Sequence, residues 1–275
     1  MNITSNKNSF SSTQIQKLMR GTNVISTKKT RMGGTITWLK MSNGDEVFLK
    51  TGKNFERREL LREYRNLKIL KGKLPVPKVL FFNDNLTTVE IVLQKVPGKP
   101  LHELCQFWNR NRIVSIIGDI LLALWDSKES LISSDIRRGL EEELEDISLL
   151  LENDIINVVD FQTASRGRHP LEVYYEVKKN LGTRQFNVLS HGDFCLPNIM
   201  VSEDGSWTLI DFGKAGIADY FRDLSSIKNS LERNLDMLAY LELLSYLKFQ
   251  DYTEEINNKT SAYHLLDLFW HNAQL

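Results

Sequence analysis

The sequence predicts an α+β fold made of two lobes, a β-rich N-terminal lobe and a mainly helical C-terminal lobe. Three observations predict it. In the first third of the chain, apolar residues alternate with polar ones and turn dipeptides interrupt them, as in antiparallel strands. Later, apolar residues recur at helical spacing over long segments. Between the two patterns, the proline- and glycine-rich stretch Pro97–Pro100 predicts a boundary.

The predicted lobes cover residues 13–95 and 96–275. Residues 1–12 are rich in serine and asparagine, so we expect them to form a mobile N-terminus. A chain of 275 residues has enough apolar side chains for either one large domain or two lobes.

The N-terminal lobe is predicted to consist of strands around one helix. Strands are expected at 22–27, 35–41, 46–50 and 87–96, and a helix at 55–70. The dipeptide Asn43-Gly44 favours a tight hairpin turn before the third strand. Pro75 and Pro77 cannot continue the helix, so it must end before them.

The C-terminal lobe is predicted to be mostly helical. Helices are expected at 113–124, 139–154, 235–249 and 263–270. In the second of these, the inward stripe is predicted to be Leu140, Leu144, Ile147 and Leu151. The many acidic residues between them could bind a cation, but we interpret them as the solvated face of an amphipathic helix.

Composition excludes some classes of function. Lys+Arg and Asp+Glu balance at 35 each, which gives no basic surface for nucleic acid. No run approaches the roughly 20 apolar residues that span a bilayer. The polar N-terminus lacks the apolar core of a signal peptide, and Cys105 and Cys195 form no disulfide or metal motif. We therefore expect a cytoplasmic protein that binds neither nucleic acid nor membrane.

Two aspartates and an asparagine stand at the ends of short apolar runs. Asp204-Gly205 predicts a turn between two strands, so Asn198 before the first strand should lie beside Asp211 after the second. Asp193 lies five residues before Asn198 in the loop leading to it. We therefore expect the three side chains to converge.

This group could bind a metal ion and a phosphate, or it could serve only as turn residues. Mg²⁺ prefers oxygen ligands and is commonly shared between one or two side chains and substrate phosphates, which suits Asn198 and Asp211. Asp193 is then placed to accept a proton from an attacking hydroxyl. Asp and Asn are also common in turns, but the D-x4-N spacing followed by D-F-G is far more specific and favours phosphoryl transfer.

On these motifs, the chain resembles the aminoglycoside 3'-phosphotransferase (kanamycin kinase) family, which has a protein-kinase-like fold. The segments HGDFCLPNIMV and LIDFGKAGIADYFRDL resemble the two signature segments of that family, and EVFLK and GKLPVPKVL resemble its N-terminal lobe. The resemblance runs from about Val24 to the C-terminus. It implies ATP, with GTP possible, and Mg²⁺ as cofactors.

The resemblance implies a nucleotide site in the N-terminal lobe. Lys50 would hold the α- and β-phosphates, and Glu63 would orient Lys50, with Glu59 as the other possible partner. Phe48 would stack on the adenine. The backbone from Gln94 to Val96 would bond the edge of the base.

The resemblance also implies roles for residues around the signature segments. Asp193 would be the catalytic base, and Asn198 and Asp211 would be the Mg²⁺ ligands. Asp223 would brace the catalytic loop from inside, and His191 would serve as its scaffold.

Acidic side chains should line the acceptor site of that family because an aminoglycoside is a polycation. The resemblance implies this role for Asp160, Glu232 and Asp267. The chain departs from the family pattern at Gln162–Ser165, Arg233 and Leu268, and it has Lys214 where the family usually has arginine.

The leading hypothesis is therefore ATP- and Mg²⁺-dependent transfer of a phosphoryl group to a small-molecule hydroxyl, in the family the 3'-hydroxyl of an aminoglycoside, which confers resistance. The segment after D-F-G is too short for the peptide platform of a protein kinase. The missing acids favour a second hypothesis, a less cationic hydroxylated metabolite or antibiotic as acceptor. A third is a nucleotide-binding scaffold without turnover. The sequence does not predict an oligomeric state.

Overall fold

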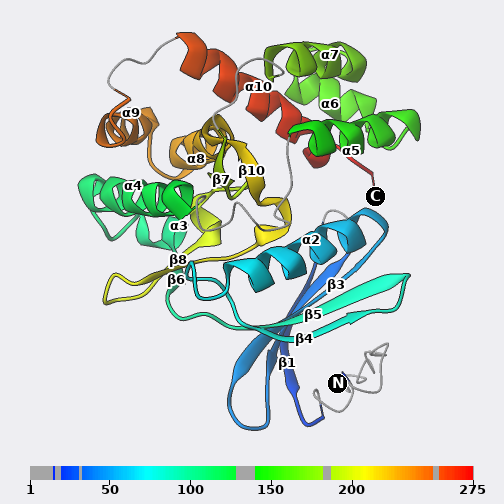
Figure 1. Ribbon diagram of the computed structural model, residues 1–275, viewed down its shortest axis with the longest axis vertical. Coiled ribbons are helices and arrows are strands. Elements are labelled where there is room, and N and C mark those ends of the chain that lie inside the picture. The colour runs from blue at the N-terminus through cyan, green and yellow to red at the C-terminus, as the bar shows by residue number, and fades with distance from the viewer. Residues whose placement is uncertain are drawn as a thin grey trace, which may run out of the picture. The chain divides into compact units, whose positions relative to one another are not determined.

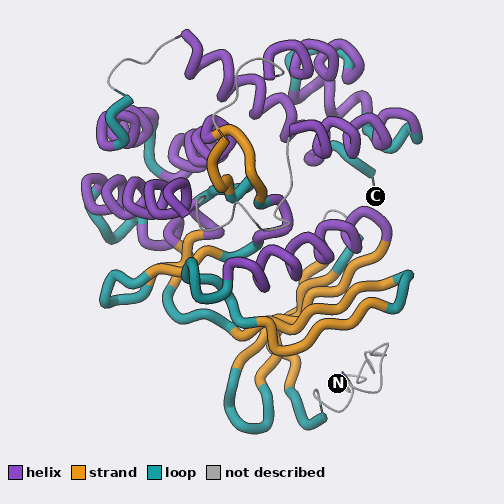
Figure 2. Tube along the Cα trace, viewed as in Figure 1, coloured by secondary structure: helices purple, strands orange, loops and turns teal. Residues whose placement is uncertain are grey.

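The computed structural model describes residues 15, 20–30, 33–127, 140–181, 187–249 and 254–274 (Figures 1 and 2). The segment predicted to be a mobile N-terminus lies outside the described residues. By their contacts, the described residues up to Leu60 together with Val79–Lys95 form one compact unit, and Leu61–Lys78 with the described residues from Val96 onward form a second. The predicted α+β class is confirmed, with strands in the first unit and mainly helices in the second.

The first unit is built on one five-stranded antiparallel sheet with the order β1-β2-β3-β5-β4. Its strands are β1 (Asn23–Lys29), β2 (Thr35–Lys40), β3 (Glu46–Lys53), β4 (Val79–Asp84) and β5 (Thr88–Gln94). Four of these were predicted, but β4 was not, because the two prolines before it dominate the local pattern. The predicted hairpin turn is also confirmed, since the N–H of Met41 donates to the carbonyl of Asp45 at 2.7 Å.

One face of this sheet carries the core of the unit. Ile15 packs there against a buried cluster of Leu39, Val47, Leu49 and Val92. Since side chains alternate along a strand, Phe48 and Lys50 lie on the opposite face of β3. Both are half-buried, which leaves part of each side chain available to a ligand.

Helix α2 (Asn54–Leu70) confirms the predicted helix and belongs to both units, with its C-terminal half in the second. The other helices are α3 (Leu101–Leu104), α4 (Arg110–Asp126), α5 (Leu140–Glu152), α6 (Val158–Ala164), α7 (Pro170–Leu181), α8 (Tyr220–Asn234), α9 (Met237–Tyr246) and α10 (Glu254–His271). Helix α8 packs against both α9 and α10 (Figure 1). The apolar helix predicted at 113–124 is buried as expected, within α4.

Two small sheets lie among these helices. The predicted hairpin is confirmed as β8 (Ile199–Val201) paired with β9 (Trp207–Leu209), and β6 (Lys99–Pro100) extends it. A second ribbon pairs β7 (Asn187–Ser190) with β10 (Gly216–Asp219). The loop from β7 to β8 carries Asp193 and Asn198, and the segment from β9 to β10 carries Asp211.

The interpretation of the acidic helix α5 was wrong for two of its acids. Glu142 and Glu145 are exposed as predicted, but Glu143 and Asp146 are each only 3% exposed. The reason is that an arginine meets each buried carboxylate, so neither charge is buried alone. The apolar stripe also differs at its end, because Leu150 is fully buried and Leu151 only partly.

Adjacent residues of α6 provide a test of the packing in the second unit. Phe161 is fully buried, with its ring centroid 4.7 Å from that of Phe269 in α10, whereas Val159 is 71% exposed. We expect Phe161→Ala to lower the free energy of unfolding by about 3–5 kcal/mol because it leaves a cavity. Val159→Ala should change it by less than about 0.5 kcal/mol. Urea unfolding measures both, and equal losses would contradict this packing.

Candidate active site

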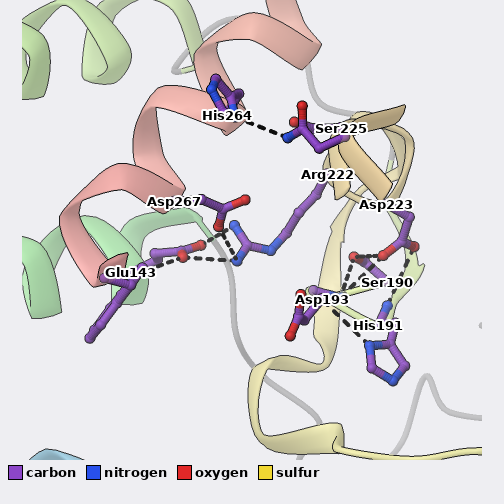
Figure 3. A network of polar contacts seen from close by, with 12 residues as sticks. Glu143, Ser190, His191, Asp193, Arg222, Asp223, Ser225, His264 and Asp267 are labelled. Carbon is purple, nitrogen blue, oxygen red and sulfur yellow. Dashed lines mark hydrogen bonds and ion pairs between the residues drawn. The ribbon is translucent and has the colours of Figure 1, made fainter. Parts of the chain in front are cut away.

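The loop that follows β7 is held by one buried carboxylate. Asp223, in the first turn of α8, accepts hydrogen bonds from Ser190 Oγ at 2.8 Å and from the N–H groups of His191 and Gly192 at 3.3 and 3.1 Å (Figure 3). The indole of Trp125 donates to it as well, at 3.1 Å. Burial raises the pKa of Asp223, and the donors around the carboxylate act in the opposite direction.

His191 connects this loop to the start of the D-F-G segment. Its Nδ1 accepts from the N–H of Asp193 at 3.3 Å, so Nε2 carries the proton and donates to the carbonyl of Ile210 at 3.0 Å. The ring is fully buried and lies against Phe212, with 4.7 Å between centroids. The backbone positions of Asp193 and Asp211 are therefore tied to one imidazole.

Asn198 lies beside Asp193, as the sequence analysis predicted. Its amide nitrogen donates to the carbonyl oxygen of Asp193 at 3.0 Å and to the carboxylate at 3.3 Å. The N–H of Ile210 donates to the carbonyl of Asn198 at 3.0 Å, which brings the residue before Asp211 alongside. The D-x4-N loop and the D-F-G segment are thus neighbours in space.

The donor set fits a Mg²⁺ ion that is shared with substrate phosphates. With the amide nitrogen turned toward Asp193, the side-chain oxygen of Asn198 receives no hydrogen bond from the described residues. Asp211 supplies a carboxylate from a left-handed backbone (φ 70°). Among the described residues, no group of three His, Cys, Asp or Glu side chains could hold a metal alone. A cation here would therefore need ligands from the nucleotide.

Asn66 fixes the D-F-G segment, and the sequence analysis missed it. This side chain, buried in the half of α2 that belongs to the second unit, donates to the carbonyls of Phe212 at 2.8 Å and Ala215 at 2.9 Å. An asparagine three residues after Glu63 on the same helix face was the available signal.

The residues predicted to bind the nucleotide lie on the face of the first unit's sheet opposite the Ile15 cluster. Trp38 of β2 and Phe48 of β3 stack there with 5.9 Å between ring centroids, and Lys50 follows two residues after Phe48 on the same face. A flat aromatic surface next to a lysine can bind the base and the phosphates of a nucleotide.

The end of β5 is the place where the predicted bond to the base would form. The N–H of Lys95 donates to the carbonyl of Glu46 in β3 at 3.0 Å. The backbone groups of Gln94 and Val96, one residue on either side, are therefore expected to point away from β3. The Lys95 ammonium binds the Glu46 carboxylate at 2.6 Å and lowers its pKa, which fixes this corner.

The loop between β1 and β2 contains the Gly33-Gly34 pair. The N–H of Gly34 donates to Thr30 Oγ1 at 2.8 Å, and Thr30 Oγ1 donates to Glu56 at 3.0 Å. A Cβ on Gly34 would lie 2.5 Å from the carbonyl oxygen of Thr51 and 2.6 Å from Glu56 Cγ. Only glycine allows this close packing.

Burial distinguishes the two candidate partners of Lys50. Glu63 is 1% exposed, whereas Glu59 is only partly buried. A buried carboxylate requires a cation or several donors, so burial favours Glu63 for that role. Lys50 lies in the first unit and Glu63 in the second. Their pairing stays a prediction.

The three acids predicted for the acceptor differ in their surroundings. Asp267 of α10 lies 4.0 Å from the guanidinium of Arg222, and burial raises its pKa to about 6, with Asp193 among the charges that contribute. Asp160 is exposed and forms a reciprocal cap with Asn157 at the start of α6. Glu232 is exposed near the end of α8. Of the three, Asp267 is the one that lies by a buried arginine and responds to the charge of Asp193.

Cys195 is not a nucleophile in this arrangement. Burial raises the pKa of its thiol well above the usual range, and the carboxylate of Asp193 raises it further. Both effects act against the thiolate that a nucleophilic cysteine requires.

These observations define a phosphoryl-transfer enzyme of the kinase class, with an acid, an amide and a second acid held on one braced loop and the segment next to it. The chain belongs to the phosphotransferase enzyme family, whose family model matches residues 36–255. Within the described residues, no helix is long and apolar enough to cross a membrane.

Comparison with individual proteins agrees with this. An aminoglycoside 3'-phosphotransferase from Niallia circulans is 27% identical over 260 residues, 94% of this chain and 96% of the relative. The crystal structure of an aminoglycoside-3'-phosphotransferase of type VIII has a TM-score of 0.76 at 20% identity, covering 93% of this chain and 96% of that one. An aminoglycoside phosphotransferase from Streptomyces rimosus, in complex with ADP and streptomycin, has a TM-score of 0.70 at 18% identity, covering 93% and 97%. The resemblance and the fold inferred from the sequence are confirmed.

Gly192 provides a test of the catalytic loop. It has φ +78°, and a Cβ there would lie 2.1 Å from the carbonyl oxygen of Lys214, whereas Gly205 has φ +85° and nothing within 4 Å. Both alanine variants force a left-handed alanine, but only Gly192→Ala also creates a clash. We expect Gly192→Ala to cost about 1–3 kcal/mol more stability than Gly205→Ala. It should also lower turnover at least about tenfold, as a displaced base would. Thermal unfolding and steady-state rates measure this, and equal effects would contradict the close approach.

Proposed function

We propose that this protein transfers the γ-phosphate of ATP, with Mg²⁺, to a hydroxyl group of a small molecule, most simply the 3'-hydroxyl of an aminoglycoside. The observation that carries the proposal is the braced loop, which sets Asp193 beside Asn198 and next to the D-F-G segment. Curated relatives named aminoglycoside 3'-phosphotransferase support the choice of acceptor.

Asp193 is the proposed catalytic base. Its backbone is fixed by His191, and from the described residues its carboxylate accepts a single long hydrogen bond of 3.3 Å, donated by Asn198. It can therefore accept a second hydrogen bond, from the hydroxyl of an acceptor. As that hydroxyl attacks phosphorus, its proton passes to the carboxylate, and the loop keeps the oxygen in line with the bond that breaks.

The nucleotide and the ion would be held by the residues that the sequence predicted. Asn198 and Asp211 would bind Mg²⁺, which when bound neutralises charge on the phosphoryl oxygens. Lys50 would hold the α- and β-phosphates and Glu63 would orient it. Phe48 would stack on the base, whose edge would meet the Gln94–Val96 backbone. GTP is a possible alternative nucleotide.

The segment after the D-F-G motif supports a small acceptor. The chain passes from the short helical turn Phe212–Lys214 through β10 directly into α8 at Tyr220. A protein kinase needs a long platform here to hold a peptide. The proposed acceptor therefore binds against the helical residues near Asp193.

A second candidate acceptor is a hydroxylated molecule with fewer positive charges. It is favoured by the positions at which the family pattern has an acidic residue and this chain has another residue, such as Arg233 and Leu268. Leu268 is 6% exposed and packs in the core, and Arg233 is an exposed cation near the end of α8. Fewer carboxylates would bind a polycation less tightly.

The proposal is tested by measuring ADP release with Mg-ATP and a panel of kanamycin, streptomycin, choline and neutral hydroxylated antibiotics. We expect Asp193→Ala to lower acceptor-dependent turnover by about a hundredfold or more, since the proton loses its base. The matched control is Asp204→Ala, which changes an exposed carboxylate in the β8–β9 turn and should leave the rate within about twofold.

The panel also separates the two acceptors. Saturation by micromolar kanamycin would support the aminoglycoside, and activity only with singly charged or neutral compounds would support the second candidate. Nucleotide binding with no acceptor-dependent turnover in the parent would overturn both, and would favour a scaffold.

A further inference from the structure

The second unit contains a buried ion pair with no role in the chemistry described so far. The guanidinium of Arg222, 4% exposed, makes two hydrogen bonds to the carboxylate of Glu143, one from Nη1 to Oε2 and one of 2.9 Å from Nη2 to Oε1 (Figure 3). The indole of Trp270 donates to the same carboxylate at 3.2 Å. Three helices, α5, α8 and α10, therefore meet at one carboxylate.

A buried ion pair is weak evidence for a contribution to stability. Removing two charges from water is costly, and a well-packed apolar pair can often replace a buried ion pair without loss of stability. The bidentate geometry does, however, fix the orientation of the guanidinium. The pair is therefore suited to presenting a cation at one defined point.

The group to which this cation is presented is the carboxylate of Asp267. Nη2 of Arg222, which binds Glu143, also lies 4.0 Å from the carboxylate of Asp267. Lys214 is a second cation that acts on Asp267, and its ammonium lies 6.0 Å from the centre of the Trp270 ring. Asp267 is partly exposed, at 18% of its side chain, while Arg222 and Glu143 are enclosed. Asp267 is thus the solvent-accessible member of the network, and Asp193 is among the charges that act on it.

The neighbouring residue of α8 connects this network to catalysis. Asp223 braces the loop that carries Asp193, and Arg222 directly precedes it. Two successive residues of α8 therefore contact the loop of the proposed base and the carboxylate of Asp267.

We infer that Arg222, held by Glu143, is a positioning residue that sets the carboxylate of Asp267 to bind one ammonium group of the acceptor next to Asp193. The inference rests on the proposed function. The two cations, Arg222 and Lys214, balance the charges of Glu143 and Asp267, so this part of the site attracts a polycation weakly. Binding here therefore depends on the placement of one carboxylate rather than on a general negative field.

The test compares Arg222→Met, Arg222→Lys and the double variant Arg222→Met with Glu143→Leu, in the full-length protein. The double variant replaces the pair with apolar side chains and so avoids a buried unpaired carboxylate. We expect the double variant to raise KM for kanamycin at least about tenfold, as loss of a charged hydrogen bond does. The value of kcat and the KM for ATP should stay within about twofold. Arg222→Lys should restore part of the affinity.

The matched control is Asp146→Asn. Asp146 is also a buried acid of α5 paired with an arginine at 3.0 Å, but its partner, Arg62, belongs to α2 and not to α8. It should lower stability without raising KM for the acceptor. An equal rise in KM in this control would assign the effect to general loosening and overturn the inference.

A pH profile gives a readout that a structural role would not change. Among the described residues, the charged groups that act on Asp267 include Arg222, Lys214, Glu143 and Asp193, and Arg222 lowers the pKa of Asp267 from the level that burial sets. The parent should lose acceptor affinity as pH falls through about 6, where Asp267 takes up its proton. In Arg222→Met, that loss should begin at higher pH.

Asp267→Asn completes the cycle. If Arg222 acts through Asp267, adding the double replacement to Asp267→Asn should raise KM for kanamycin no further, whereas independent, multiplied effects would overturn the inference. A parent that phosphorylates no cationic acceptor would overturn the proposed aminoglycoside function and this inference together. An active parent whose KM is unchanged by the double replacement would overturn only the inference.

Discussion

The buried carboxylate of Asp223 is the interaction on which the rest of the site depends. It gathers Ser190 Oγ and two successive backbone N–H groups of the loop, in the interior of the second unit, where no water replaces a lost partner. The loop must then turn sharply at Gly192, which places Asp193 at its outer end. The position of Asp193, the proposed base, therefore depends on a side chain of α8, which lies elsewhere in the chain.

Two further sets of contacts connect this loop and helix α8 to the rest of the second unit. In the first set, His191 donates to the carbonyl of Ile210, just before the D-F-G segment, and Asn66 of α2 donates to the carbonyl of Phe212 within it. In the second set, Arg222 of α8 binds Glu143 of α5 and lies near Asp267 of α10. Buried polar side chains such as Asp223, His191 and Asn66 hold the loop and the D-F-G segment in place, as preorganised sites require.

The sequence predicted four strands of the large sheet, the β8–β9 hairpin and the convergence of Asp193, Asn198 and Asp211, because local turns and alternation determine these features. It did not predict Asn66 or the burial of Glu143 and Asp146, because their partners lie far away along the chain and a helix of alternating acids and leucines reads as amphipathic. Charge patterns identify the exposed face of a helix only when no distant arginine packs against it.

The most direct test of the central claim is to identify the product. The full-length protein is incubated with Mg-ATP and kanamycin, and the mixture is analysed by ³¹P NMR and mass spectrometry. We predict one ADP formed for each phosphate monoester on the acceptor, attached at the 3'-oxygen. ATP consumed while the acceptor stays unmodified would contradict the claim that the braced loop directs a hydroxyl, rather than water, to phosphorus.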